Sequence, residues 1–419
     1  MLQSPWSRIG MRNLGRNPKR TILTALGLAI GFFTSVVMVG WSQGLMNEMV
    51  DNATGLVGGQ IEIHDAEFRP ERSLYDTIGG RDGIDVDQVL AQVSDDDRII
   101  AVAPRVYAGG LLSSGDSTVA GMLMGVDPER EVALSRFLDD LTAGRLPQPG
   151  RNELVVGTEM ARQLESDIGD ELVLVAPGAD GSMGNDLFTL VGTYRTGLVE
   201  IDSAFAVLPL EDLQALVVLD ESRIHEIAVS TQDPWLAEEV AAAIAATLEG
   251  EALGIEVVPW SELNPAIVEY TALVDVFYYV IIVIVFGLAI FGVANTMLMA
   301  TYERRREFAV MLAIGATPGG VVKSVLYEAA AMGLFSLALG VAITWPVMVW
   351  WHNAPPDLTG LVGDIEMMGS VVSLTMQVEY DMGFTTMVAV ALMLTSLGSA
   401  LYPAFRASRV PPADTLSGL

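Results

Sequence analysis

The sequence predicts a membrane protein with four transmembrane α-helices and a large extracytoplasmic mixed α/β domain inserted between helices 1 and 2. Three observations lead to this fold class. The 419-residue chain is 51% hydrophobic and has a mean hydropathy of +0.43, which is rare for a soluble domain. Four long windows are almost free of charge, and the acidic residues are concentrated in one block with alternating strand and helix patterns.

The four apolar windows are Thr21–Leu45, Val274–Ala300, Val325–Trp351 and Phe384–Ala404. A bilayer core needs about 20 apolar residues in a helix, and every window reaches that length. The first window is too long for the apolar part of a signal peptide. We therefore predict transmembrane helices at residues 21–45, 271–300, 321–351 and 384–404.

The charges are distributed unevenly along the chain, whose net charge is −29. Residues 46–270 contain 42 Asp and Glu, 12 Arg and no Lys, and the loop at residues 352–383 contains no Lys or Arg. By the positive-inside rule, residues 1–20, 301–320 and 405–419 face the cytoplasm, while the acidic block and the 352–383 loop face outside. The acidity argues against a nucleic-acid partner. The acidic, lysine-free block indicates either a saline habitat or a need for solubility on one side, or a cationic partner on the other.

Within residues 46–270, strand and helix patterns alternate. Residues 59–64 have a period of two, and Asn152–Leu164 reads as a strand that turns into a helix. Asp233 is a candidate N-cap for a helix at Pro234–Leu248. We expect Ser261 to cap another helix that runs unbroken into the membrane.

The first 20 residues combine basic residues with Trp6, Ile9, Met11 and Leu14. This pattern predicts a short interfacial helix that lies on anionic lipid. A disordered basic tail that only orients the chain is the alternative.

The segment between the second and third windows contains the glycine-rich sequence GATPGGVVKS at residues 315–324. A phosphate-binding loop places its lysine directly after the last glycine, whereas two valines separate Gly320 from Lys323 here. The segment also leads into an apolar helix and follows no buried strand. We therefore predict no ATP hydrolysis by this chain alone.

The preceding residues, Tyr302–Ala316, predict a short amphipathic helix. Phe308, Met311, Leu312 and Gly315 recur at helical spacing beside a charged face. These residues either lie in lipid or form a hydrophobic knob that docks into a groove of a cytoplasmic partner.

The polar residues in the apolar windows suggest structural roles. Asp275 and Glu328 lie near helix ends, and we expect Glu328 to bind nearby backbone or arginines such as those at 304–306. His64, His225 and His352 are far apart, and no metalloprotease motif is present, so we predict no metal or catalytic site. Gly27 and Gly31 form a small-xxx-small pattern that favours close helix packing, although glycine is common in membrane helices.

Several blocks together resemble a known family. The sequences RNPKRTILTALGLAIG, NTMLMATYERRREFAVMLAIGATPGGVV, YEAAAMGLFSLALG and YPAFRASRVPPADTL resemble, in order, the membrane blocks of FtsX-like ABC-transporter permeases. This group contains macrolide exporters and lipoprotein-release permeases of the LolC/LolE type. Within the acidic block, GGQIEIHDAEF, RNELVVGTEMARQL, FTLVGTYRTG and AFAVLPLEDLQAL are most similar to the lipoprotein-release branch. Macrolide exporters carry a fused ATPase, which these 419 residues lack.

The resemblance implies a non-catalytic permease in a bacterial inner membrane. Two permeases, identical or homologous, would pair with two separate ATPase subunits that bind ATP and Mg, so we expect no cofactor in this chain. A periplasmic lipoprotein or adaptor and membrane lipids are further expected partners. ATP-driven closure would move the outer domains by mechanotransmission. The expected ATPase-coupling residues are Tyr302, Glu303, Arg304, Arg305, Arg306, Glu307, Phe308, Met311, Leu312 and Gly315.

Three functions are consistent with these features. The first is extraction of lipoproteins or another amphiphile from the outer leaflet of the inner membrane. The alternatives are efflux of peptides or drugs with an adaptor and an outer-membrane channel, and non-transporting regulation of cell-wall hydrolases.

Overall fold

The computed structural model of the chain describes residues 18–417, apart from residues 70–71, 81–82, 140, 249–253, 359–364, 368–369 and 373–374. The interfacial helix predicted at the N-terminus falls almost wholly on residues 1–17, which lie outside the described part. The chain divides into two compact units. The helical unit comprises residues 1–46, 270–363 and 374–419, and the sheet unit comprises residues 47–269 and 364–373.

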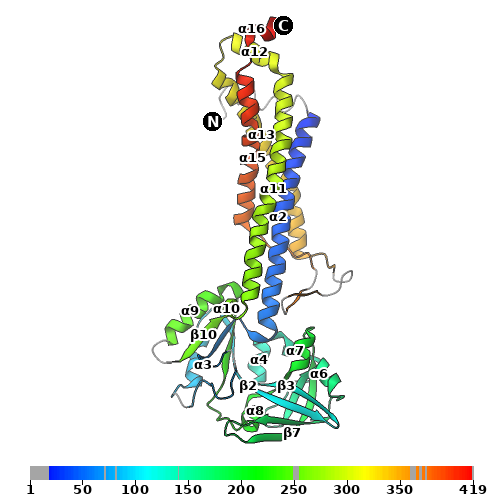
Figure 1. The fold of residues 1–419 in the computed structure, drawn as a ribbon, viewed down its shortest axis with the longest axis vertical. Helices are drawn as coiled ribbons and strands as arrows, with labels where there is room; N and C mark the ends of the chain where they lie inside the picture. Colours follow the sequence, from blue (N-terminus) through cyan, green and yellow to red (C-terminus); the bar gives the residue numbers. More distant parts are fainter. Residues whose placement is uncertain are drawn as a thin grey trace. The chain divides into compact units, whose positions relative to one another are not determined.

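The helical unit contains the four long helices that the apolar windows predict (Figure 1). They are α2 (Pro18–Ala53), α11 (Pro265–Glu303), α13 (Pro318–Asn353) and α15 (Met382–Ser408). Each is long and apolar enough to cross a membrane. Both α2 and α11 extend beyond their windows, and the boundaries between the two units fall inside these two helices.

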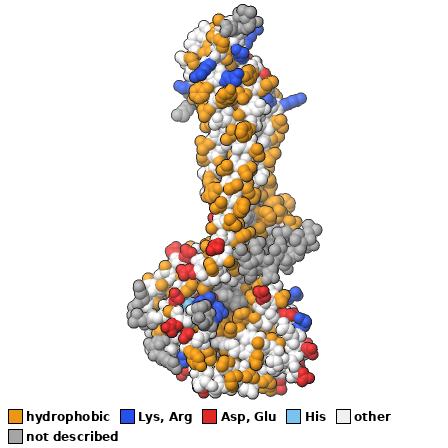
Figure 2. Space-filling view, in the orientation of Figure 1, with side chains coloured by type: hydrophobic (Ala, Val, Ile, Leu, Met, Phe, Trp, Pro, Cys, Tyr) orange, Lys and Arg blue, Asp and Glu red, His pale blue; other side chains and the backbone are white. Residues whose placement is uncertain are grey.

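Apolar side chains occur all around these helices, so the bundle has both a buried core and an exposed apolar surface. Phe32, Phe286, Val325 and Leu392 are buried in one cluster, whereas the side chain of Phe291 is 76% exposed. A helix that is apolar on every side suits a core or a lipid environment. Figure 2 shows hydrophobic side chains covering the helical unit, with Lys and Arg gathered at the end where α12 (Arg305–Ala313) and α16 (Pro412–Ser417) lie.

Small residues bring the helices together, but not all of those expected. A Cβ at Gly31 would lie 3.2 Å from Val285 of α11, whereas a Cβ at Gly27 would meet no atom of the chain within 4 Å. Within this chain only Gly31 makes a close approach, and the Gly27–Gly31 packing face as a whole stays a prediction. Closer approaches occur at Gly333, which faces Ser396 of α15, and at Gly340, which faces Phe32 of α2.

The last part of the 352–383 loop lies against α2 through polar contacts. The indole N–H of Trp41 donates to the carbonyl of Thr375 at 3.2 Å, and Gln43 donates to Asp381 at 2.9 Å. Asp381 also caps α15, because its carboxylate accepts the N–H of Phe384 at 2.8 Å. The loop itself contains a two-stranded ribbon of β11 (Ile365–Met367) and β12 (Ser370–Val372).

The sheet unit is the mixed α/β domain that the sequence predicts. Its strands have the order β10-β1-β9-β2-β3-β8-β5-β7-β4, and β6 pairs with β2 and β7. The strands are β1 (Ile61–Asp65), β2 (Ile99–Ser114), β3 (Ser117–Val126), β4 (Leu141–Gly144), β5 (Glu153–Gly157), β6 (Glu171–Pro177), β7 (Met183–Tyr194), β8 (Phe205–Pro209), β9 (Glu226–Thr231) and β10 (Ile255–Pro259). The helices are η1 (Thr54–Gly58), α3 (Val86–Ser94), α4 (Pro128–Leu134), α5 (Arg136–Asp139), α6 (Thr158–Gln163), α7 (Val199–Ala204), α8 (Leu210–Leu216), η2 (Pro234–Leu236), α9 (Ala237–Leu248) and α10 (Trp260–Leu263).

The long strand β2 joins the two halves of this sheet. Its first half, from Ile99 to Arg105, pairs with β9, and its second half, from Arg105 to Ser114, pairs with β3. Arg105 therefore stands where the strand changes partners. Its guanidinium is fully buried and binds Glu131 and Glu226.

The two predicted helix caps, Asp233 and Ser261, have different outcomes. Asp233 caps the helical segment η2–α9 as predicted, because its carboxylate accepts the N–H of Trp235 at 3.0 Å. The unbroken helix expected from Ser261 is wrong, since α10 ends at Leu263 and α11 begins at Pro265. Asn264 precedes a proline, which disfavours helical backbone there. The hydroxyl of Ser261 donates to Glu238 instead of capping.

Candidate functional site

The segment between α11 and α13 is the candidate site, and it is more sharply bent than the sequence predicts. The short helix predicted within Tyr302–Ala316 is present as α12, but its predicted bounds are wrong, because α11 continues to Glu303 and α12 covers only Arg305–Ala313. Arg304 lies between the two helices with φ −101° and ψ 12°. Tyr302 and Glu303 thus belong to the end of a membrane helix, and Glu303 pairs with Arg20 of α2 at 3.2 Å.

Gly315 ends α12 and reverses the chain. Its φ is +100°, a left-handed conformation that favours glycine. The N–H of Ala316 donates to the carbonyl of Met311 at 3.0 Å, and the N–H of Gly315 donates to Leu312 at 3.2 Å. These are the two hydrogen bonds of a Schellman motif. Thr317 then caps α13 by accepting the N–H of Gly320 at 3.2 Å. Gly315 is therefore a turn residue by conformation.

Arg304 ties α12 to α13. Its Nη1 lies 2.8 Å from the Glu328 carboxylate, and its Nε lies 3.2 Å from Glu307. The guanidinium also lies over the ring of Phe308, 5.1 Å from the ring centroid. The Arg304 and Glu328 side chains are only 14% and 12% exposed. The structure thus pairs Glu328 with one of the arginines expected to hold it, and Asp275 is exposed on α11.

The face of α12 that packs into the bundle is the face expected to meet a partner. Phe308 is 0% exposed and belongs to the core of the helical unit, and Met311 and Leu312 pack against the same core. Phe308 therefore packs inside the helical unit, and its expected contact with a partner stays a prediction. Apolar residues surround α12 on nearly every side, so periodicity alone does not identify its outer face.

The outer face of α12 carries residues that sequence reasoning missed. Ile314 is 79% exposed and Val310 is 43% exposed, and Arg306 lies one turn before Val310. Residues 306, 310 and 314 fall on one side of a helix because they are four residues apart. The short helix α16 packs against α12, so two elements distant in sequence meet at this end of the helical unit (Figure 1).

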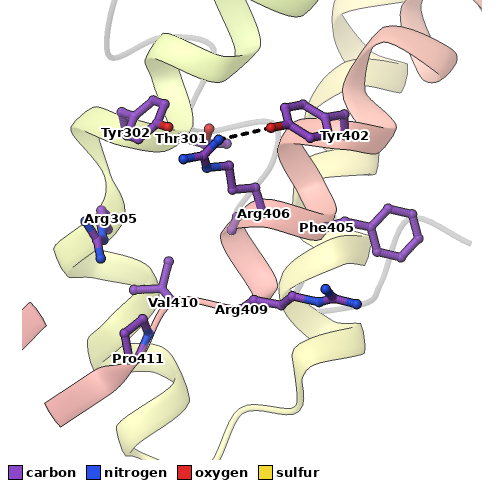
Figure 3. Close-up of a pocket in the computed structure, with 10 residues that line it drawn as sticks. Thr301, Tyr302, Arg305, Tyr402, Phe405, Arg406, Arg409, Val410 and Pro411 are labelled. Carbon is purple, nitrogen blue, oxygen red and sulfur yellow. Dashed lines mark hydrogen bonds between the residues drawn. The ribbon is translucent and has the colours of Figure 1, made fainter. Parts of the chain in front are cut away.

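A hollow of about 520 Å³ lies beside α12 in the same unit. It lies between the ends of α11 and α15 and the start of α12 (Figure 3). Arg406 extends between Tyr302 and Tyr402, with its Nη1 3.0 Å from the Tyr402 hydroxyl and its guanidinium 5.1 Å from the Tyr302 ring centroid. Arg305 and Arg409 also line the hollow.

The histidines, which are distant in sequence, partly converge in the structure. His64 and His225 flank the ring of Phe68, at centroid distances of 5.8 and 5.5 Å, while His352 lies on α13. His225 accepts the N–H of Tyr107 at 3.0 Å, and burial lowers the pKa of this imidazole to about 4. No group of three or more potential metal ligands occurs among the described residues.

The buried charges around Arg105 form a second polar cluster, in the sheet unit. Arg105 contacts Glu131 through Nη2 and Nε and Glu226 through Nη1, the last at 3.2 Å. One oxygen of Glu226 has no hydrogen-bond partner among the residues that the structure describes. Burial, together with the negative charge of Glu62, raises the pKa of Glu226 to about 7.

Two protein-family models match this chain, one over its first part and one over its second part. The family model described as "MacB-like periplasmic core domain" matches residues 21–247, more than half of the chain, and the model described as "FtsX-like permease C-terminal" matches residues 279–412. The candidate site lies within the second match.

Curated relatives align along the whole chain. The lipoprotein-releasing system transmembrane protein LolC of Neisseria meningitidis serogroup B is 25% identical, and the alignment covers 97% of this chain and 98% of that protein. The corresponding protein LolE of Haemophilus influenzae is 21% identical, with 97% of both chains covered. The macrolide export ATP-binding/permease protein MacB of a Shewanella species is 24% identical, and the alignment covers 95% of this chain but 58% of that protein. On the matches to both units, the chain belongs to the family of FtsX-like permeases with a MacB-like periplasmic core domain.

Proposed function

We propose that this chain is the permease subunit of an ABC transporter that releases lipoproteins from the bacterial inner membrane. The observation that carries this proposal is the alignment with LolC, a lipoprotein-releasing transmembrane protein. The alignment covers 97% of this chain and 98% of LolC. ATP hydrolysis belongs to a separate ATPase subunit, and this chain transmits the resulting movement.

In this proposal α12 is the element that contacts the ATPase subunit and receives its movement. Its exposed apolar residues, Val310 and Ile314, form the knob that seats in a groove of the ATPase, with Arg306 beside them. Arg304 passes the movement from α12 to α13 through Glu328. The helices α2 and α11 then carry it onward, since each is an unbroken helix that contains a boundary between the two units.

The proposed orientation places α12 and both termini in the cytoplasm and the sheet unit in the periplasm. The family description of the matched domain as periplasmic supports it, as do the arginines around α12. A second permease, identical or homologous, completes the complex.

The docking role of α12 is tested with Val310→Asp and Ile314→Asp in the full chain. Each places a charge where we propose an apolar contact, so we expect loss of ATPase co-purification and of ATPase stimulation. The chain should still insert and show an unchanged melting temperature, because both side chains are exposed. Leu111→Asp places the same charge at an apolar residue of β2 that is exposed like Val310 but lies in the sheet unit, and it serves as the control. Normal ATPase recruitment by both α12 variants would refute the docking role.

Efflux is the second candidate, because MacB aligns with 95% of this chain. Deletion of the gene distinguishes the two functions. Lipoproteins retained in the inner membrane would support release, whereas increased sensitivity to macrolides with normal lipoprotein sorting would support efflux.

A further inference from the structure

The hollow between α11, α12 and α15 is lined by arginines that have no acidic partner among the described residues. Its wall includes Arg305, Arg406 and Arg409, and no acidic side chain lines it among the described residues. The neighbouring acid Glu303 is already paired with Arg20. The side chains of Arg305 and Arg409 make neither a hydrogen bond nor an ion pair with any described residue.

The guanidinium of Arg406 is held ready to bind an anion. The Tyr302 ring and the Tyr402 hydroxyl fix its position (Figure 3). Only one of its nitrogens hydrogen-bonds to a described residue, whereas a guanidinium offers five N–H donors in a planar fork that matches a phosphate. A preorganised arginine loses less freedom when it binds.

The surroundings of the hollow are those of a membrane interface. Tyr302, Tyr402 and Phe405 are 48%, 60% and 56% exposed, and aromatic side chains concentrate where a bilayer meets water. Along α15, an exposed apolar stripe of Val390, Leu394 and Leu401 leads to Phe405, which is one of the residues that line the hollow. A ligand with a phosphate and a long apolar part fits both features.

We propose that this hollow binds the headgroup phosphate of an anionic phospholipid, whose acyl chains lie along the exposed stripe of α15. The volume of about 520 Å³ falls within the roughly 300–1,000 Å³ that is common for small-molecule sites. Basic pockets between membrane helices are suited to such headgroups. The lipid would fill the space between α11 and α15 and hold the start of α12 in place.

This site is separate from the surface proposed to receive the ATPase. Successive residues of a helix are about 100° apart, so Arg305 points roughly 140–180° away from Val310 and Ile314. The lipid proposal rests on the membrane-spanning helices and does not depend on the ATPase. Ile314→Asp should therefore lose the ATPase and keep the lipid, which separates failure of one proposal from failure of the other.

The test is native mass spectrometry of the full chain in an uncharged detergent, titrated with phosphatidylglycerol or phosphatidylcholine. The variants are Arg409→Gln and the double variant Arg406→Gln/Arg409→Gln. Lys323→Gln, an exposed basic residue of α13 that does not line the hollow, is the control. We expect the wild type to prefer phosphatidylglycerol. Each arginine removed should weaken that binding roughly fivefold, the effect of one basic residue near an anionic membrane surface, and the control should match the wild type.

Three kinds of result would overturn the proposal. The first is a lack of specificity, seen either as equal binding of both lipids or as an equal loss of phosphatidylglycerol binding in Lys323→Gln and Arg409→Gln. The second is displacement of phosphatidylglycerol by millimolar inorganic phosphate, which would indicate a site for a soluble anion. The third is displacement of the lipid by the ATPase subunit together with loss of ATPase binding in Arg409→Gln, which would make the hollow a protein-docking surface. Arg409→Gln removes no contact between described residues, so misfolding does not obscure the result.

Discussion

Arg304 shows how one side chain can decide what a segment does. Its guanidinium contacts α12 through Glu307 and Phe308 and contacts α13 through Glu328. The sequence places three arginines together at residues 304–306 but does not distinguish among them. The structure does, because Arg304 is largely buried and paired, whereas Arg305 and Arg306 are exposed.

The Arg304–Glu328 pair should contribute measurably to stability. Glu328→Ala leaves a mostly buried guanidinium with one partner fewer, which costs about 1–3 kcal/mol of the free energy of unfolding. Asp275→Ala, at an exposed position of α11, should change it by less than about 0.5 kcal/mol. Unfolding in detergent micelles measures both. Equal effects of the two variants would contradict the role of the pair.

Glu226 should make the stability of the sheet unit depend on pH. Its pKa is about 7 in the folded chain and near 4.5 when unfolded, so below pH 4.5 both states hold the proton and no penalty exists. As the pH rises from 4.5 to about 7, only the unfolded state releases the proton, so the free energy of unfolding falls.

Glu226→Gln should remove this dependence. The variant should lose less stability than the wild type between pH 5 and pH 7.5, measured as urea unfolding of the full chain. His225 acts in the opposite sense, since its pKa of about 4 lies below the unfolded value and costs stability as the pH falls from 6.5 to 4. That contribution is present in both proteins and cancels in the difference. Parallel pH profiles for the two proteins would refute the assignment to Glu226.

At the scale of elements, the sequence predicts which segments form helices. It does not predict where each helix ends or which of its faces is buried. The apolar windows predicted all four long helices, and α9 begins behind Asp233 as expected. The breaks at Arg304 and Asn264 were not predicted. The sequence around Arg304 contains no proline or glycine to signal a break, and Arg304 pairs with Glu328, which is 24 residues away. At Asn264 the following proline was a usable signal.

Glycine contacts between elements provide a prediction at this scale. A Cβ at Gly44 of α2 would collide with the carbonyl oxygen of Gln377, which belongs to the segment before α15, whereas a Cβ at Gly27 meets nothing in this chain. Gly44→Ala should therefore lower the melting temperature, at a cost of about 1–3 kcal/mol. Gly27→Ala is the matched control. If Gly27→Ala lowers the melting temperature as much as Gly44→Ala, Gly27 packs against something outside this chain, such as a second permease.

For the whole molecule, the decisive property is which side of the membrane each unit occupies. The chain contains no cysteine, so single cysteines can report on it directly. Asp180→Cys lies in an exposed turn of the sheet unit, and Ile314→Cys lies at the exposed end of α12. A thiol reagent that cannot cross membranes should label Asp180→Cys in cells whose outer membrane is permeabilised. It should label Ile314→Cys only after the inner membrane is opened. The reverse pattern would invalidate the proposed direction of force.

The sequence by itself determined the membrane class, the four helices, the inserted α/β domain and the family, because long apolar runs, charge segregation and block order are local properties of the chain. Only the tertiary structure decided which side of α12 is free, that Arg304 is the residue that binds Glu328, and that Arg305, Arg406 and Arg409 surround one hollow. These facts depend on contacts between residues far apart in the chain. The apolar pattern of α12 is compatible with either face being buried, and packing against α13, α15 and α16 makes the choice.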